Sequence, residues 1–289
     1  MKKLILATTL ALSSVSVNAA VISAGGISWD DDGLGAGGVA NQANFQQWFT
    51  ETPTSTNSGS DSTLDTADDY KFISSSSAVS VTEGDPADVG KELVGIGEFY
   101  SFSDGREPNN APAFCDSGSC ELTFAFGGLV VDSFVGLLPI FDVSEAWFNI
   151  YIDETPNFDG PGTSDTTLGS DAYTKYAEAQ DGTLFAALSF DFFNLEGTII
   201  GGEAEAGLSI RDIFGLGLDD VKEAWNYSDV SSDLGFTAGA TFDTNNLYTR
   251  DGNGQTIGTP AQDVSAPSTV ALFGLTLMCL VGATRRRRC

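Results

Sequence analysis

Apolar and polar residues alternate with a period of two along much of the central part of the chain. In the segment 92–102 the alternation places one set of residues on a common face: Leu93, Gly95, Gly97 and Phe99. In the segment 121–131 it separates two sets, Leu122, Phe124 and Phe126 on one side and Thr123 and Ala125 on the other. Such alternation is typical of β-strands that bury one face.

Similar segments follow at residues 146–153, 182–193, 197–210 and 236–245. They are rich in Phe, Val, Ile and Thr, and residues common in turns separate them. The pattern predicts an all-β protein with antiparallel strands, in the form of a β-sandwich or a jelly-roll-like single domain. We find no internal repeat of fixed period, which makes a solenoid or a propeller an unsuitable model.

The segment 40–51 fits two kinds of element. Phe45, Trp48 and Phe49 have the spacing of one face of a short amphipathic helix. Phe45, Gln47 and Phe49 also have the spacing of one face of a strand. Twelve residues are too few for the period to decide. The polar segment 52–70, which follows, is predicted to be an exposed, mobile loop.

The amino-terminal sequence "MKKLILATTLALSSVSVNAA" has the order of a secretory signal. Lys2 and Lys3 precede an apolar stretch, and small residues follow it. This order predicts a signal helix within residues 1–19, Sec-dependent export and cleavage between Ala19 and Ala20.

The carboxyl-terminal sequence combines an apolar run with a basic end. Residues 270–283 are uncharged and would span about 20 Å as a helix, whereas a bilayer core is about 30 Å thick. Four arginines follow and would remain cytoplasmic: Arg285, Arg286, Arg287 and Arg288. The segment is therefore predicted to be a short apolar helix and a marginal membrane anchor.

The charge of the chain restricts its partners. Its 289 residues include 40 acidic and 13 basic ones, for a net charge of −27. Six of the basic residues belong to the two end segments, so the body between them carries seven against 40, a charge of −33. This balance excludes nucleic acid and anionic headgroups as good partners and suits calcium or neutral glycans.

Histidine is absent, which excludes the Ser-His-Asp and Cys-His catalytic arrangements and every imidazole metal site. Glycoside hydrolysis needs only two carboxylates. Candidates on predicted strands are Glu98, Glu145, Asp153, Glu203 and Glu205. Almost any pair among 40 acids would satisfy this pattern, so we predict no enzymatic activity and no cofactor other than a possible calcium ion.

Acidic loops offer oxygen ligands for calcium. The candidate ligands are Asp30, Asp31, Asp32, Asp65, Asp68 and Asp69, with Asp251 and Asn253 in a further segment. The spacing does not match an EF-hand, because the sixth and twelfth positions counted from Asp251 are Thr256 and Gln262. Both a weak calcium site and solvated acidic loops therefore remain open.

Two other residue types suggest specific roles. The tryptophans could stack on sugar rings or belong to the core: Trp29, Trp48, Trp147 and Trp225. Cys115 and Cys120 flank a turn-forming Asp-Ser-Gly-Ser, which predicts a disulfide in an oxidising compartment. Cys279 and Cys289 have no evident partner in the sequence.

The tail sequence "VSAPSTVALFGL" (residues 264–275), followed by the apolar run and the arginines, resembles the PEP-CTERM sorting signal "VPEPSTLALLGL". Val264 and Pro267 match that signal, whereas Ser265 and Ala266 replace its Pro and Glu. Such tails are also labelled ice-binding protein C-terminal domains. The resemblance implies transient anchoring in the inner membrane of a Gram-negative bacterium and cleavage near Pro267 by an exosortase-type enzyme. The body would then pass to the cell surface or the exopolysaccharide of a biofilm matrix.

These observations divide the chain into a signal peptide (1–19), a secreted β-rich domain (20–262) and a sorting tail (263–289). We expect the domain to be a structural or adhesive module of the cell surface or the exopolysaccharide matrix, with exopolysaccharide or other glycans as partners. The alternatives are a calcium-dependent glycan-binding module and a glycoside hydrolase.

Overall fold

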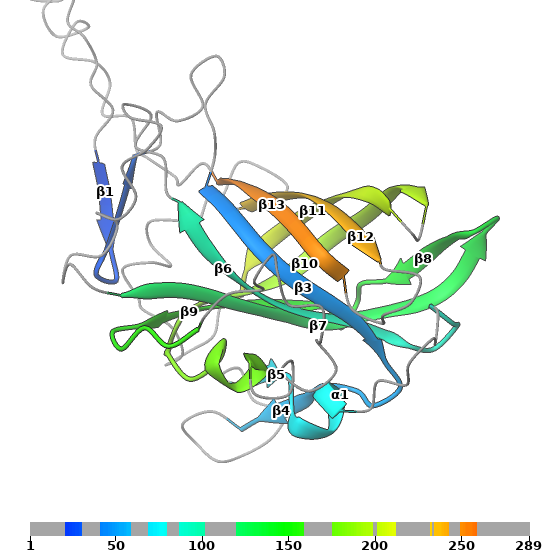
Figure 1. Cartoon of the computed structure of the whole chain (residues 1–289), viewed down its shortest axis with the longest axis horizontal. Helices are drawn as coiled ribbons and strands as arrows, with labels where there is room; N and C mark the ends of the chain where they lie inside the picture. Colours follow the sequence, from blue (N-terminus) through cyan, green and yellow to red (C-terminus); the bar gives the residue numbers. More distant parts are fainter. Residues whose placement is uncertain are drawn as a thin grey trace, which may run out of the picture.

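A computed structural model describes residues 21–30, 41–58, 69–79, 87–101, 120–158, 175–198, 201–211, 232, 234–242 and 249–258. Strands dominate this part of the chain, as the alternating pattern predicts (Figure 1). The strands are β1 (Val21–Ala24), β2 (Ile27–Asp30), β3 (Asn41–Thr50), β4 (Ser55–Asn57), β5 (Tyr70–Phe72), β6 (Glu92–Ser101), β7 (Glu121–Val135), β8 (Leu138–Asp142), β9 (Trp147–Asp153), β10 (Thr183–Thr198), β11 (Gly201–Ile210), β12 (Leu234–Phe242) and β13 (Thr249–Gly258). The short helix α1 spans Ser75–Val79.

The principal sheet has nine strands in the order β6-β3-β13-β12-β11-β10-β9-β7-β8, with a further pairing between β6 and β7. All of them except β8 form a ring. In this ring each strand pairs antiparallel with the next one along the chain, and the last strand, β13, pairs with the first, β3. The sheet therefore curls until its ends meet through β6 and β7. Strand β8 pairs with the end of β7 beyond this ring.

The single curled sheet corrects the prediction of a β-sandwich or jelly roll, which would require two stacked sheets. Both arrangements place one face of every strand toward a common interior, so period-two alternation does not distinguish them. Twist and bulges produce the curvature. Register shifts occur in β7 beside Gly128, whose φ is 74°, and twice in β10.

The structure decides three assignments of secondary structure along the chain. Residues 41–50 form a strand, not a helix, with Phe45, Gln47 and Phe49 on one face. The segment around Asp251 is not a loop but part of β13. Residues 55–57, within the segment predicted as a mobile loop, form β4 and pair with β5, which begins at the last residue of that segment.

The inward face of the curled sheet carries an apolar core dominated by phenylalanine. Leu93 and Phe99 of β6 belong to it, as the alternation predicts. Gly95 and Gly97 lie between them, where the rings of Phe126 and Phe124 occupy the space that a Cβ would need. Glycine at these positions thus allows large rings to pack directly on the backbone of β6.

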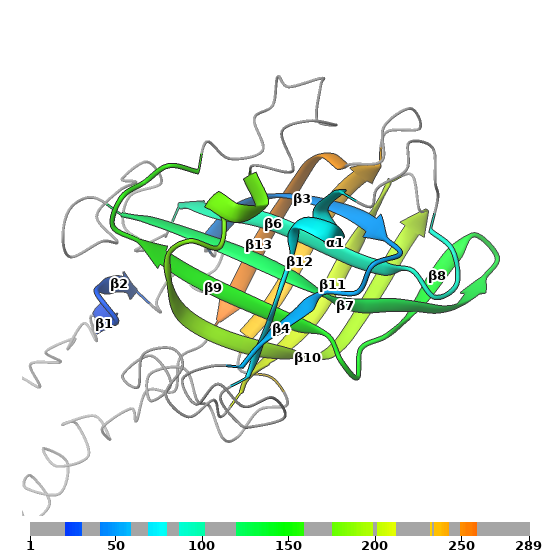
Figure 2. The same ribbon diagram turned by 90° about the horizontal axis from the view of Figure 1, so that it is seen from below.

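A second core covers the outward face of β3, β6, β7 and β9. Its buried members are Trp48, Ile73, Ala78, Val94, Ile96, Ala125, Trp147, Tyr151, Phe158 and Ala179. Helix α1, the β4–β5 pair and a helical turn at residues 175–178 lie over this face (Figure 2). Both faces of these strands are therefore apolar, although only the inward face lines the interior of the curled sheet.

Hydrogen bonds attach this outer layer to the sheet. The indole N–H of Trp48 donates to the carbonyl oxygen of Ser77 (3.2 Å), and that of Trp147 donates to Oγ1 of Thr54 (3.2 Å). The buried carboxylate of Glu92 accepts the backbone N–H of Thr54 (2.9 Å) and the backbone N–H of Gly128. These bonds attach the outer layer to β3, β6 and β9, and the bond between Glu92 and Gly128 joins β6 to β7.

Among the described residues, no helix is long and apolar enough to cross a membrane. The predicted signal helix, with Ala19 and Ala20, and the predicted apolar helix of the tail both lie outside the described residues.

Candidate functional site: an apolar pocket inside the curled sheet

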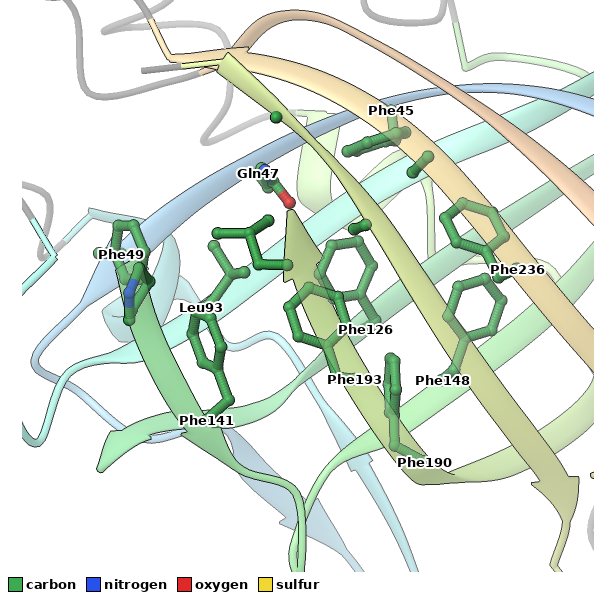
Figure 3. Close-up of a pocket in the computed structure, with 15 residues that line it drawn as sticks. Phe45, Gln47, Phe49, Leu93, Phe126, Phe141, Phe148, Phe190, Phe193 and Phe236 are labelled. Atoms are coloured by element: carbon green, nitrogen blue, oxygen red, sulfur yellow. The ribbon is translucent and has the colours of Figure 1, made fainter. Parts of the chain in front are cut away.

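The interior of the curled sheet contains a pocket lined almost entirely by hydrocarbon side chains (Figure 3). The pocket and the open space at its mouth together have a volume of about 650 Å³. Its lining consists of Phe45, Gln47, Phe49, Leu93, Phe126, Pro139, Phe141, Phe148, Phe190, Phe193, Leu195, Gly202, Ala204, Phe236 and Ala238. The single polar side chain of this set is that of Gln47, which is buried.

The two sides of the pocket differ in side-chain size. Strands β3, β7, β9 and β10 contribute most of the phenylalanines, whereas β11 contributes only Gly202 and Ala204, and β12 contributes Ala238 beside Phe236. Glu203, Glu205 and Thr237 alternate with these small residues and are exposed on the outside. The space therefore lies where small residues of β11 and β12 face the rings across the interior.

Aromatic contacts hold the rings that face this space. Phe148 stacks on Phe124, with ring centroids 5.0 Å apart, and on Phe126, with the ring planes 4° apart. Phe236 contacts Phe148 at 5.8 Å and Phe45 at 6.1 Å. Since each ring is held by others, the pocket walls are already arranged without a ligand.

Strand β8 supplies one rim of the pocket. Its buried Pro139 and its half-buried Phe141 are part of the lining. Phe141 meets Phe193 of β10 edge to face at 5.2 Å and stacks on Phe49 of β3 at 6.4 Å. Strand β8, which lies outside the ring of eight strands, thus narrows the mouth of the pocket with the aromatic side chain of Phe141.

None of the carboxylates considered for glycoside hydrolysis lines the pocket. Glu145 is exposed and forms an ion pair with Lys71 (2.6 Å). Asp153 accepts the backbone N–H of Thr155 (2.8 Å) at the end of β9. Glu203 and Glu205 face outward, and Glu98 is half-buried. All five acids therefore lie outside the apolar lining of the pocket. The pocket lining itself offers no acid–base pair.

The predicted calcium ligands are described only in part. Asp69 is buried just before β5, and Asp30 ends β2. Asp31, Asp32, Asp65 and Asp68 lie outside the described residues. Within the described ranges, no group of three or more acidic or cysteine side chains is placed to hold a metal ion. Calcium binding at these loops remains a prediction.

Two of the four tryptophans are buried in the outer core rather than available to stack on sugars. Trp48 is 0% exposed and Trp147 is 1% exposed. The backbone of Trp29 lies in β2, and Trp225 lies outside the described residues. Trp48 and Trp147 therefore stabilise the attachment of the outer layer and are not available as a sugar platform.

The remaining sequence-predicted sites lie at or beyond the limits of the described chain. Cys120 is disulfide-bonded, and its predicted partner Cys115 is outside the described residues, so the pairing stays a prediction. The sorting residues also lie outside them: Val264, Ser265, Ala266, Pro267, Arg285, Arg286, Arg287 and Arg288.

Comparison with protein-family models, with curated proteins and with solved structures finds no match for this chain. The resemblance of the tail to a sorting signal therefore remains a proposal. The assignment of a function to the domain depends on the geometry of the pocket.

Sequence reasoning did not identify the pocket, although it identified most of the strands that form it. The alternation shows which residues face inward, but an inward phenylalanine can fill a core or line a cavity equally well. One signal was present in "SFVGLLPIFD" (residues 133–142), an apolar segment with Gly136 and Pro139 that lacks strict alternation. This segment forms the end of β7 and the strand β8, which closes one side of the mouth.

Proposed function

We propose that this protein is an exported cell-surface or matrix protein whose domain binds a slender, uncharged apolar molecule inside the curled sheet. The observation that carries the proposal is the composition of the lining, in which Gln47 is the one polar side chain among fifteen residues. Binding pockets for small molecules are typically concave, mostly apolar and largely formed in advance. This pocket is concave and mostly apolar, and the contacts among its phenylalanine rings form it in advance.

The chemistry of the lining selects the ligand class. Burial of hydrocarbon surface contributes about 25 cal/mol per Å², and the pocket offers few polar groups to compensate a polar ligand for lost water. The net charge of −27 also disfavours ligands with an anionic headgroup. A neutral molecule with a hydrocarbon chain or a small hydrophobic ring fits both conditions.

The proposal replaces a purely adhesive role with binding of a small molecule, and it keeps the proposed route to the cell surface. Export by a signal peptide and sorting by a tail like that of residues 264–288 would place the domain outside the cell. A glycan-binding role has less support, because Trp48 and Trp147 are buried. Acid–base catalysis in the pocket has less support as well, because carboxylates do not line it.

Displacement of a fluorescent apolar probe tests the proposal. A naphthalene-based dye that brightens in apolar surroundings should bind the protein with saturable stoichiometry, and added 1-dodecanol should displace it. Ala238 faces the pocket and is 7% exposed, so Ala238→Leu should reduce the occupancy of the dye by filling the space. Thr237→Leu adds the same side chain at the next residue, which faces outward, and should leave binding unchanged.

Two results would contradict the proposed function. One is the absence of saturable dye binding by a protein that melts cooperatively. The other is an equal loss of binding in Ala238→Leu and Thr237→Leu. Either result would identify the interior as an ordinary core whose space accepts no ligand.

A further inference from the structure

The end of the β7–β8 hairpin exposes apolar side chains to solvent. The exposed fractions are 37% for Phe134, 68% for Val135, 77% for Leu137 and 45% for Ile140, and these four residues are called the hairpin tip below. They are four of the five large hydrophobic residues that are exposed in the described part of the chain. Figures 1 and 2 both show the hairpin projecting beyond the rest of the sheet.

The local sequence accounts for this projecting shape. Val135 pairs with Leu138, so the turn contains only Gly136 and Leu137, and Gly136 has a φ of 68°. A left-handed glycine in a two-residue turn matches the twist of the flanking strands. The hairpin therefore ends in a tight, regular turn, and Leu137 is the most exposed apolar side chain on it.

The distribution of charge along the hairpin is uneven. Residues 133–141 carry no charge, and Asp132 and Asp142 stand on either side of them. The backbone N–H of Ser144 donates to the carboxylate of Asp142 (2.9 Å) and lowers the pKa of Asp142, which keeps this group ionised. The hairpin thus has an apolar end and an anionic base.

Two observations argue against another protein or a second copy of this chain as the partner. The hairpin tip offers roughly 400 Å² of apolar surface at the areas usual for such side chains, about half of the ~800 Å² per partner of a stable complex. Two copies would also each carry a net charge of −27 and repel each other. A fluid hydrocarbon layer needs neither a large area nor a complementary shape.

We propose that the hairpin tip inserts into the surface of a zwitterionic phospholipid bilayer. The ammonium groups of such headgroups can face Asp132 and Asp142, while the tip reaches the acyl chains between them. The inward side of the same strand carries Pro139 and Phe141 at the mouth of the pocket, so insertion would bring this mouth to the lipid surface. The inference does not depend on whether the pocket holds a ligand.

Quenching by brominated acyl chains tests the insertion. The purified protein is mixed with phosphatidylcholine vesicles, and the emission added by Leu137→Trp is obtained by subtracting the spectrum of the parent protein. This added emission should shift to shorter wavelength and lose most of its intensity when the lipids carry bromine on their acyl chains. Ala177→Trp is the matched control and should show neither effect. Ala177 is exposed on the helical turn that covers the outward face of the sheet.

A second pair of measurements addresses the polarity of the tip and the lipid class. Val135→Thr combined with Leu137→Ser should reduce recovery of the protein with floated vesicles, while its melting temperature stays that of the parent. Phosphatidylglycerol vesicles at low salt should recover less protein than phosphatidylcholine vesicles, because the anionic lipid repels the acidic surface. The parent and the double variant keep the same chain ends, so the ends do not account for a difference between these two proteins.

Three outcomes would overturn the inference. The first is equal quenching of Leu137→Trp and Ala177→Trp, which indicates unspecific adsorption. The second is the absence of quenching at Leu137→Trp while the protein floats with the vesicles. The third is a concentration-dependent dimer that Val135→Thr with Leu137→Ser abolishes, which assigns the tip to a second copy.

Discussion

Phe141 of β8 stacks on Phe49 of β3, with ring centroids 6.4 Å apart and ring planes 8° apart. The two strands are not paired with each other, because β8 pairs only with the end of β7 among the described strands. The contact therefore spans the mouth of the pocket rather than a strand ladder. It connects the hairpin that projects from the sheet to the wall of the interior.

Loss of this contact should speed ligand exchange. Phe141→Ala removes this contact and the contact with Phe193, each worth about 0.5–1.5 kcal/mol, so we expect dissociation of a bound dye to quicken roughly fivefold or more. Stopped-flow displacement by excess 1-dodecanol measures the rate. Ile140→Ala changes the neighbouring residue, which is exposed and does not line the pocket, and should leave the rate unchanged. Equal rates in the parent and Phe141→Ala would show that this ring does not close the mouth.

The close packing of rings on β6 predicts a specific cost of adding a methyl group. A Cβ at Gly97 would collide with the ring of Phe124 and with the carbonyl oxygen of Asn44. Gly97→Ala should therefore lower the free energy of unfolding by about 1–3 kcal/mol. Thermal melting of Gly239→Ala provides the control, because nothing lies within 4 Å of a Cβ there. An unchanged melting temperature for Gly97→Ala would contradict the described packing.

The carboxylate of Glu92 should be necessary for attachment of the outer layer. Its two oxygens accept separate backbone N–H groups, those of Thr54 and Gly128. Glu92→Gln places an amide N–H against one of these donors, and we expect a loss of about 1–3 kcal/mol in chemical denaturation. Glu196→Gln, on an exposed part of β10, should cost little. A similar small effect in both variants would show that the bonds of Glu92 contribute no net stability.

Glu121 should make stability depend on pH. Burial raises the pKa of Glu121 above its ordinary value of 4.5. Hydrogen bonds from the backbone N–H groups of Asn157 and Phe158 lower the pKa by less. The nearby carboxylates of Asp153 and Asp181 raise it further. A raised folded-state pKa means that the folded protein binds this proton more tightly than the unfolded chain does. The resulting stability is present below about pH 4.5 and is lost as the pH rises through the folded-state pKa.

Glu121→Gln should remove this dependence while keeping an oxygen acceptor for Asn157 and Phe158. Between about pH 4 and pH 7 the melting temperature of the parent should fall relative to that of the variant. Differential scanning fluorimetry across this range, at constant ionic strength, measures the difference. A difference that is constant with pH, or that grows in the opposite direction, would contradict a raised pKa at Glu121.

The sequence predicts the strands well because one face of each is buried. Leu93, Phe99 and Phe124 lie on the inward face that the alternation assigns to them. It does not predict the closure of the sheet, because strand pairing depends on bulges such as that beside Gly128 and on pairing partners distant in the chain. The pairing of β3 with β13 joins residues about two hundred positions apart.

The candidate site was harder to predict than the fold. The acidic residues drew attention to charged ligands, yet Glu203 and Glu205 face outward while their small neighbour Ala204 lines the pocket. An alanine or a glycine carries no chemical signal in a sequence, and only the rings across the interior show its role. The same limit applies to Gly202, which lines the pocket through the absence of a side chain.

Native mass spectrometry after incubation with 1-dodecanol tests the central claim most directly, because it counts bound molecules without a reporter. The account predicts an added mass of one dodecanol on the parent protein and on Thr237→Leu, and its loss in Ala238→Leu. The absence of added mass on the parent at the solubility limit of the alcohol, or the same added mass on all three proteins, would contradict a binding pocket inside the curled sheet.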